Sequence, residues 1–507
     1  MICEILPNVT ILTEDGAIRD AEVDFNENNG LEVSLTAKRD FVKHIILRWN
    51  IEMPSDARFL GDAWERGYGD FEWRGFVADR AMPWYFFISF AESSTIGIGV
   101  KVRPNALCCW NADEQGITLL LDVRNGGNGV HLNGRTLKLA TIVEKSYSGI
   151  TEYSAACDFC GIMCDDPILP PDPVYGGNNW YYAYGNSSHE DIIEDAAFIA
   201  SLSQGLKNRP YMVIDDGWSP NMTKGPWGCG NERFPDMPLL AKNISDFNVI
   251  PGIWIRYLCD KSENIPEKMF LRKKYGHLDP SNPDVLRKVA EDTRRLTKWG
   301  YRLIKHDFST FDIFGSWGRN AGNYLSEDGW SFSDNTKTSA EIIINFYQTI
   351  LRNAGNSLIL GCNCIGHLCA GLVHINRIGD DTSGIVWERT KKMGVNTLAF
   401  RHCQNKKFFC IDADCVGITE KIPWEYNQQW LRLLSVSGSP LFVSVKRAAL
   451  TKECLSDLKK AFAVNSVQKD TFEPLDWKQS TTPRFFLING EEKMFSWNEK
   501  HGIKQYI

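Results

Sequence analysis

The chain has 507 residues, a length that accommodates two or three domains with one sizeable core. A net charge of −7 and a pI near 5.8 give no electrostatic reason to expect nucleic acid or an anionic membrane as a partner. No run approaches the ~18 consecutive apolar residues that a membrane-spanning helix needs, so we expect a globular protein without a membrane partner.

The start of the chain, MICEILPNVT, contains an acidic residue and lacks a basic region before an apolar one, so we expect no signal peptide and a cytoplasmic location. The 15 cysteines are scattered, which fits reduced thiols better than a disulfide framework. Cys157, Cys160 and Cys164 form the run CDFCGIMC. This run could be half of a metal site, although unligated thiols are the interpretation we prefer.

Residues 1–165 contain short β-rich runs, such as FVKHIILRWN and GITLLLDV, separated by turn signals such as NGGNG. This pattern predicts an antiparallel β-sandwich domain. The stretch 165–179, DDPILPPDPVYGGNN, is dense in Pro, Gly and Asp and is predicted to be a linker.

Between residues 175 and 450, short apolar runs alternate with helical patterns. The runs are WYYAYG, YMVIDDGW, NVIPGIWIRY, YRLIKHDF, SLILGCNC, VHINRIGDD, FFCIDADC and SPLFVS. This alternation predicts a (β/α)8 TIM barrel of the α/β class. An open doubly wound sheet is the alternative, and the absence of a G-x-G-x-x-G turn after the first strand counts against it.

Helix boundaries in this region have clear sequence signals. Ser187-x-x-Glu190 and Thr338-x-x-Glu341 fit capping boxes, and Asn282-Pro283 fits a cap followed by a first-turn proline. Residues 465–507 return to a β pattern, with Asn489-Gly490 suited to a hairpin turn, so a small C-terminal β-sheet domain is predicted.

Acidic residues end four of the predicted barrel strands: Asp215-Asp216, Asp307, Asp380-Asp381 and Asp412. The carboxyl ends of barrel strands meet at one mouth, which is where active sites of this fold lie. A hard cation could bind there. Lys305 and Arg377 lie close to these acids in sequence, however, which favours carboxylates of fixed geometry, so we expect no metal and no cofactor.

Two carboxylates can cleave a glycosidic bond when one attacks the anomeric carbon and the other donates a proton. Asp307 is the predicted nucleophile, kept ionised by Lys305 two residues earlier on the same face of the strand. Asp380 is the predicted acid/base, with Asp381 as the alternative because alternation sends only one of them inward. Burial and the charge of Asp307 should raise the pKa of the acid/base. The alternative is that these acids have only structural roles, as partners in ion pairs or as helix caps. That alternative would have to be true of the acids at every one of these strand ends.

These motifs resemble those of the α-galactosidase and raffinose-synthase-like glycoside hydrolases, families 36 and 27, over residues 175–450. IDDGW (214–218) implies that Asp215 and Asp216 hold sugar hydroxyls and that Trp218 forms a wall of the pocket. LIKHD (303–307) is similar to a K-x-D motif, which implies that Asp307 is the nucleophile and that Lys305 contacts the substrate.

RIGDD (377–381) resembles an R-x-S-D-D motif, which points to Asp380 for proton transfer and to Arg377 for holding a ring hydroxyl. CNC (362–364) lies where the family has a cysteine, which implies a substrate contact from Cys364. Trp254 and Trp180 are expected against the sugar ring. Departures from the family at His306, Gly379 and CNCIGH are expected to line the sugar pocket.

The sequence therefore predicts a retaining α-glycosidase of α-galactosidase type that acts on an oligosaccharide or glycoside without a cofactor. Two alternatives remain: a raffinose-synthase-like transglycosylase, whose acceptor subsite the loop 311–335 would shape, and a non-catalytic carbohydrate-binding barrel. The resemblance also allows a homo-oligomer.

Overall fold

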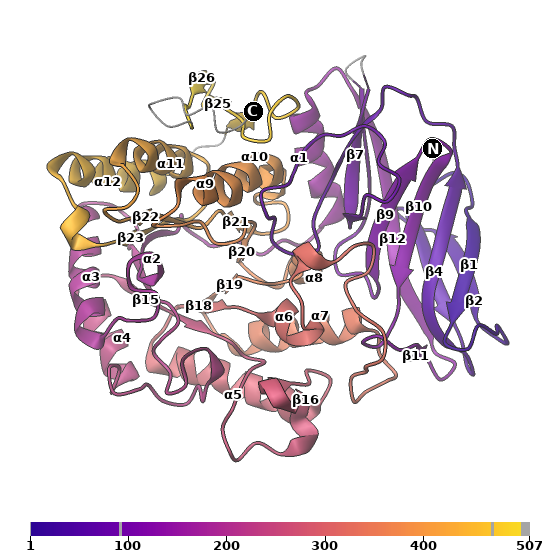
Figure 1. Ribbon diagram of the computed structural model, residues 1–507, viewed down its shortest axis with the longest axis horizontal. Helices are drawn as coiled ribbons and strands as arrows, with labels where there is room; N and C mark the ends of the chain where they lie inside the picture. Colours follow the sequence, from indigo (N-terminus) through magenta and orange to yellow (C-terminus); the bar gives the residue numbers. More distant parts are fainter. Residues whose placement is uncertain (1, 91–93, 468–470, 498–507) are drawn as a thin grey trace.

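The computed structural model describes residues 2–90, 94–467 and 471–497 (Figure 1). A β-sandwich, drawn in indigo and purple, packs beside a barrel of parallel strands covered by helices, and a small sheet follows the barrel. The predicted architecture is thus confirmed. Within the described ranges, none of the helices combines the length and apolar content that crossing a membrane requires.

The sandwich consists of two antiparallel sheets. The first has the order β1 (Asn8–Thr13), β4 (Phe41–Asn50), β10 (Gly116–Asp122), β9 (Leu107–Asp113), β6 (Met82–Pro83), with β11 (Val130–His131) also on β4. The second has the order β2 (Glu22–Glu27), β3 (Leu31–Thr36), β12 (Thr136–Ser148), β8 (Ser94–Val100), β7 (Tyr85–Ser89), β5 (Arg58–Gly61).

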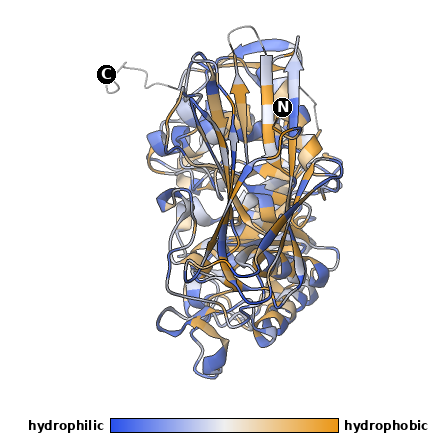
Figure 2. Ribbon diagram, turned by 90° about the vertical axis from the view of Figure 1, so that its right-hand side faces the viewer, coloured by the Kyte–Doolittle hydropathy of each residue, from blue (hydrophilic) through white to orange (hydrophobic). Residues whose placement is uncertain are grey.

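Alternation along the strands builds the core of the sandwich. In β3, Leu31, Val33 and Leu35 are buried while the residues between them are partly exposed. Figure 2 shows hydrophobic segments along these strands and mostly hydrophilic loops. Helix α1 (Glu152–Met163) packs against β8, where Gly97 leaves room for the ring of Phe159.

The barrel sheet contains nine parallel strands in the order β21, β20, β19, β18, β15, β14, β13, β23, β22. The strands are β13 (Tyr175–Asn178), β14 (Tyr211–Ile214), β15 (Ile250–Ile255), β18 (Leu303–His306), β19 (Leu358–Gly361), β20 (Ile375–Arg377), β21 (Cys410–Asp412), β22 (Cys415–Ile418) and β23 (Leu441–Val445). The main helices around them are α3 (His189–Leu202), α4 (Met237–Asp246), α5 (Pro283–Trp299), α7 (Ser339–Asn353), α11 (Trp424–Val436) and α12 (Lys452–Asn465).

We call each of the eight strand positions around the barrel a stave. The barrel closes through a bend in its seventh stave. β21 pairs with β20 on one side, and β22, only two residues later, pairs with β23 on the other. Asp414 lies at the bend with a φ of 75°. Counting β21 and β22 as one stave reduces the nine strands to the eight that the sequence predicts.

The first stave differs from the prediction. WYYAYG is not a strand, because Trp180–Ala183 forms the short helix α2. The strand is β13, inside the segment predicted to be a linker. Gly176 explains why this strand has the composition of a linker. A Cβ at this position would lie 1.9 Å from the carbonyl oxygen of Tyr211 on the next strand, so the position requires glycine.

Helix starts follow the sequence signals closely. Thr338 and Glu341 form the predicted capping box, and Asn282 caps α5 ahead of its proline. At α3 the capping box lies one residue later than predicted, on Ser188 and Asp191. Helix α12 packs on α11 and α3, so the helical layer continues past residue 450.

The C-terminal sheet contains β24 (Phe472–Pro474), β25 (Phe485–Ile488) and β26 (Glu491–Met494). Asn489 and Gly490 form the predicted turn between the last two strands, with φ values of 52° and 81°. Residues 468–470 and 498–507 of the predicted C-terminal domain lie outside the described residues.

Candidate active site

A cavity of about 370 Å³ lies at the carboxyl ends of the barrel strands. It contains five carboxylates, all from the predicted strand ends, together with basic and aromatic side chains. Its lining residues are Arg66, Tyr68, Trp180, Asp215, Asp216, Thr223, Trp254, Lys305, Asp307, Phe308, Trp317, Arg319, Asp380, Asp381 and Arg389.

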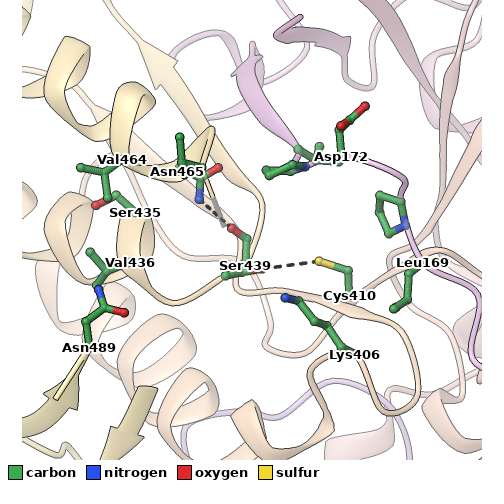
Figure 3. Close-up of a pocket in the computed structure, with 15 residues that line it drawn as sticks. Leu169, Asp172, Lys406, Cys410, Ser435, Val436, Ser439, Val464, Asn465 and Asn489 are labelled. Carbon is green, nitrogen blue, oxygen red and sulfur yellow. Dashed lines mark hydrogen bonds between the residues drawn. The ribbon is translucent and has the colours of Figure 1, made fainter. Parts of the chain in front are cut away.

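A second, smaller cavity lies at the opposite end of the barrel (Figure 3). Val174, Cys410 and Ser439 place it at the amino-terminal ends of β13, β21 and β23. Asp172 is the one carboxylate among its described lining residues. Of these two cavities, the one at the carboxyl ends is therefore the one that could support chemistry requiring two carboxylates.

Asp307 follows β18 directly and is held by two donors. The indole Nε1 of Trp254 donates to Oδ2 at 3.2 Å, and the backbone N–H of Phe308 donates to Oδ1 at 2.7 Å. Lys305 does not pair with Asp307 as predicted. Its Nζ lies 2.7 Å from Oδ2 of Asp215, because both side chains project inward from nearby staves of the barrel.

Phe308 adopts a left-handed conformation, with a φ of 63°, that turns the chain immediately after Asp307. Such backbone strain in a non-glycine residue is often found at functional sites. The guanidinium of Arg256 lies 4.2 Å from the centre of the Phe308 ring and pairs with the buried Asp312 at 2.5 Å. Burial raises the pKa of Asp312 to about 6, although Arg256 lowers it.

Asp215 and Asp216 follow β14 and are held by asparagines of the first stave. Asn178 donates its side-chain amide to Oδ2 of Asp215 at 2.7 Å, and the Asp215 N–H donates to Oδ1 of Asn179 at 2.7 Å. Burial, followed by the charges of Asp215 and Asp307, raises the pKa of Asp216 to about 7. The two neighbouring carboxyls therefore differ in environment: one is paired with Lys305, and the other has no cation as a direct partner among the described residues.

Asp380 and Asp381 both line the cavity but have different partners. Both oxygens of Asp380 are engaged, one by Arg66 at 3.2 Å and the other by Arg389 at 2.7 Å. Asp381 pairs with Arg377 through one oxygen, at 3.2 Å, and its side chain is 38% exposed, compared with 13% for Asp380. The side chain of Asp381 is therefore the more accessible of the two.

The expected rise in the pKa of the acid/base does not hold for Asp381. Burial raises this pKa, but the guanidiniums of Arg377 and Arg66 outweigh burial and hold it below its ordinary value. The positive charges around the sixth stave, rather than the negative charge of Asp307, dominate its surroundings.

Three predicted substrate contacts are not among the described residues that line the cavity. Trp218 is buried behind Trp254 and donates its indole N–H to the Trp254 carbonyl at 2.8 Å. Arg377 pairs with the carboxylates of the sixth and seventh staves: Asp381, Asp412 and Asp414. Cys364 lies against His306, 3.7 Å from Nε2, outside the barrel interior.

Cys362, rather than Cys364, continues the inward side of the fifth stave. It packs inside the barrel with Leu358 and Leu360, and burial, followed by the charge of Asp307, raises the pKa of its thiol. Cys362 and Cys364 have the same parity as Leu358, but the strand ends at Gly361, so alternation holds for Cys362 and no longer for Cys364.

No protein-family model matches the sequence. The α-galactosidase from Thermus thermophilus, solved with p-nitrophenyl α-D-galactopyranoside, superposes with a TM-score of 0.64 at 16% identity, over 96% of this chain and 99% of the other. A GH36 α-galactosidase from Geobacillus stearothermophilus superposes with a TM-score of 0.58 at 13% identity, over 90% of this chain and 75% of the other. The fold is that of the GH36 α-galactosidases.

In this GH36 fold, two of the noted sequence departures do not line the pocket. His306 is fully buried, and its ring points outward to Phe346 and Tyr347 on α7. Gly379 faces the helical layer, where a Cβ would lie 2.1 Å from the carbonyl oxygen of Met393. These two departures from the family motifs therefore affect packing behind the site rather than the shape of the cavity.

Sequence reasoning missed the contribution of the sandwich. Arg66 and Tyr68 reach the cavity from the loop after β5. Gly67 fixes this loop to the sixth stave, because its N–H donates to the Ile378 carbonyl at 2.7 Å and its own carbonyl accepts from the Asp380 N–H at 2.9 Å. The signal available in the sequence was the segment WERGYGDFEWRGF, which is rich in aromatic and charged residues but lacks strand alternation.

The cysteine run on α1 lies away from the cavity. All 15 cysteines of the chain are free, and Cys160 is buried while Cys157 is partly exposed. Among the described residues, no group of three His, Cys, Asp or Glu side chains is placed to hold a metal ion.

Proposed function

We propose that this protein is a retaining α-glycosidase of α-galactosidase type. The observation that carries the proposal is the carboxylate of Asp307, which is oriented by Trp254 and Phe308 and shares a cavity with the carboxylate of Asp381. Its neighbours in fold include α-galactosidases solved with p-nitrophenyl α-D-galactopyranoside and with stachyose, which supports a terminal α-galactosyl group as the substrate.

In the first step, Asp307 attacks the anomeric carbon while the bond to the leaving oxygen breaks and that oxygen receives a proton from the acid/base. The product is a covalent glycosyl ester on Asp307. In the second step, the acid/base takes a proton from water, which attacks the anomeric carbon and releases Asp307. Two inversions give net retention of the α configuration.

We assign the acid/base role to Asp381. Asp380 has guanidiniums on both oxygens and would have to break an ion pair to transfer a proton. The guanidiniums that lower the pKa of Asp381 favour its ionised form, which is the form that accepts a proton in the second step. The first step, in which the same carboxyl donates a proton, is therefore the one we expect to be slow at neutral pH.

Asp215 and Asp216 would bind hydroxyls of the non-reducing sugar, since both line the cavity beside the nucleophile. Trp180 and Trp254 line the same cavity and offer flat faces to the ring. Lys305, neutralised by Asp215, would donate to a sugar hydroxyl and hold Asp215 in place.

Azide rescue tests both carboxylate assignments. We expect Asp307→Gly to lose at least 10³-fold in turnover of 4-nitrophenyl α-galactoside, because the attacking group is absent. Azide should restore turnover and give β-galactosyl azide. Full hydrolysis by Asp307→Gly without azide would refute the assignment.

Asp381→Ala and Asp380→Ala form a matched pair. With an activated leaving group, the variant that lacks the acid/base should accumulate the glycosyl ester, and azide should release α-galactosyl azide from it. We expect this behaviour from Asp381→Ala alone. The same behaviour from Asp380→Ala alone would return the role to Asp380.

Transfer to a second sugar is the alternative that the cavity also accommodates. Trp317 and Arg319 come from the loop 311–335 and line the mouth beside Phe308, where an acceptor could stack. Product analysis with excess galactose or sucrose distinguishes transfer from hydrolysis.

A further inference from the structure

Three arginines from separate parts of the chain line one side of the active-site cavity. Arg66 belongs to the sandwich loop, Arg319 to the short helix η4 (Gly318–Asn320), and Arg389 to the short helix α9 (Trp387–Thr390). We call these three residues the arginine rim. A neutral sugar needs hydroxyl-binding groups but no concentration of positive charge, so the rim calls for an explanation.

Arg66 is buried yet incompletely paired. Its side chain is 6% exposed, and its guanidinium lies over Trp317, 5.1 Å from the ring centre. It reaches Asp380 at 3.2 Å and Asp381 at 3.9 Å. Its Nε has no hydrogen-bond partner within the described structure. A buried donor without a partner is costly, so the carboxylates that hold Arg66 do not satisfy all of its guanidinium.

Arg319 adds a charge that no carboxylate balances. Its guanidinium lies 5.7 Å from the ring centre of Tyr68, and it forms no ion pair in the part of the chain described. Arg389 pairs with Asp380 at 2.7 Å, but this is the carboxylate that Arg66 also uses. Asp380 thus serves both Arg66 and Arg389, and Arg319 is the guanidinium of the rim that has no carboxylate partner among the described residues.

The rim lies on the side of the leaving group. Arg66 and Arg389 both hold Asp380, the residue next to the proposed acid/base, and an acid/base must contact the leaving oxygen. Asp215 and Asp216, which would hold the non-reducing sugar, are instead provided by the second stave. A group that contacts the arginine rim would thus belong to the aglycone.

We propose that the preferred substrates are α-galactosides whose aglycone carries an oxyanion, a carboxylate or a phosphate, bound by the arginine rim. Guanidinium groups bind planar and tetrahedral oxyanions with paired hydrogen bonds, which suits both anions. Trp317 and Tyr68, stacked with Arg66 and Arg319, form aromatic surfaces between which the aglycone lies. The inference rests on the proposed glycosidase function and specifies its substrate class.

Paired synthetic substrates test this proposal. 4-Carboxyphenyl and 4-carbamoylphenyl α-D-galactopyranosides have similar shapes and leaving groups but differ by one negative charge, and a 4-phosphonooxyphenyl analogue tests the phosphate. We expect kcat/KM for at least one anionic substrate to exceed that for the amide about tenfold at low ionic strength. Added salt should reduce the difference, because the rim is partly exposed. The ratio of kcat/KM for the carboxylate substrate to kcat/KM for the phosphate substrate shows which of the two anions the arginine rim prefers.

Arg319→Gln should lower the ratio of anionic to neutral kcat/KM several-fold, whatever its effect on each rate. Arg352→Gln is the control, since Arg352 is exposed on α7 and contacts only Gln348 among the described side chains. It should leave the ratio unchanged. Equal kcat/KM for the anionic and neutral substrates, or an unchanged ratio in Arg319→Gln, would overturn the proposal while leaving the glycosidase function intact. Failure to cleave any of the galactosides would refute the glycosidase function itself.

Discussion

Asp216 is a carboxyl group whose surroundings oppose its ionisation. It is 5% exposed, follows another carboxylate in sequence and lies close enough to Asp307 to sense its charge. Its pKa rises from 3.8 to about 7, so at neutral pH it carries a proton part of the time. A protonated carboxyl can donate as well as accept a hydrogen bond, which widens the set of sugar hydroxyls it can bind.

This raised pKa predicts a specific dependence of stability on pH. Between pH 4 and pH 7 the folded state binds more protons at Asp216 than the unfolded state does, so the stability contributed by this group falls as the pH rises. Above pH 7 the full cost of the buried charge applies, at most about 4 kcal/mol. Asp216→Asn removes that cost and can still accept the hydrogen bond from the Gly217 N–H.

We expect the apparent Tm of Asp216→Asn to exceed that of the wild type by a few degrees at pH 8 and to match it near pH 4. Differential scanning calorimetry over this range measures the difference. Asp215→Asn is the comparison, because it removes the partner of the buried Lys305 and should destabilise the protein by ~3–5 kcal/mol at pH 8. A Tm difference for Asp216→Asn that does not change with pH would show that the pKa of Asp216 is not raised in the folded state.

At the residue scale, five of the carboxylates predicted at strand ends line the cavity, but Asp412 pairs with Arg377 instead, and Asp380 and Asp381 both line the cavity although alternation predicted only one of them there. The sequence also did not predict which cation pairs with which carboxylate. Lys305 and Asp307 share one face of a strand, yet Lys305 pairs with Asp215 across the barrel. Alternation within one strand gives the direction of a side chain, whereas its partner depends on the distances between staves. The donors that orient Asp307, an indole and a backbone N–H, leave no trace in the K-x-D motif.

At the scale of elements, the bend in the seventh stave is what lets the sheet close. Asp414 takes the left-handed conformation between β21 and β22, and its carboxylate connects several elements. It accepts hydrogen bonds from the Thr382 N–H at 2.7 Å and from the Tyr181 hydroxyl, and it pairs with Arg377 at 2.7 Å. Asn and Asp tolerate this backbone conformation better than other residues with a side chain.

Asp414→Ala should therefore be among the most damaging single changes in the barrel. It would place alanine at a φ of 75° and would remove a buried partner of Arg377, at a cost of about 3–5 kcal/mol. Asp414→Asn keeps the backbone preference and most hydrogen bonds, so it should cost less than half as much. Urea unfolding followed by tryptophan fluorescence compares the two. Equal stability of Asp414→Ala and the wild type would mean that the bend does not depend on this side chain.

Strand composition explains which elements were predicted and which were missed. The staves from β14 to β20 are almost entirely buried and mostly apolar, as expected for strands covered on both faces, and the sequence identified them; their polar residues, such as Lys305 and Arg377, lie towards the strand ends. The first stave, YGGN, contains two glycines because the neighbouring backbone approaches closely at Gly176. Its sequence is indistinguishable from a loop until the neighbouring strand is known.

At the scale of the whole molecule, the sandwich is part of the active site rather than an appendage. Its loop after β5 supplies Arg66 and Tyr68, and the pairing of Gly67 with Gly379 fixes that loop to the sixth stave. A second contact joins Asn125 of the sandwich to the end of the loop 311–335 and the residues just after it, through hydrogen bonds to the carbonyls of Asp334 and Lys337. Contacts between domains depend on residues far apart in the sequence, so neither could be predicted from it.

The ion pair between Asp62 and Arg401 holds this arrangement together. Arg401 is 2% exposed, lies 2.7 Å from Asp62 through Nε, and donates to the carbonyls of Glu65 in the sandwich and Ile378 in the barrel. In Asp62→Ala the guanidinium would remain buried without its carboxylate, which costs about 3–5 kcal/mol. Because the loop that carries Arg66 begins at this ion pair, we expect kcat/KM for the galactosides to fall together with the apparent Tm.

Asp79→Ala is the matched control, because Asp79 lies on the same loop but is exposed and forms no ion pair in the described structure. Its Tm and kcat/KM should equal those of the wild type. If Asp62→Ala lost stability but kept full kcat/KM toward every galactoside, the sandwich would support the barrel without shaping its cavity. A joint loss restricted to Asp62→Ala is the result expected if the active site is assembled between the two domains.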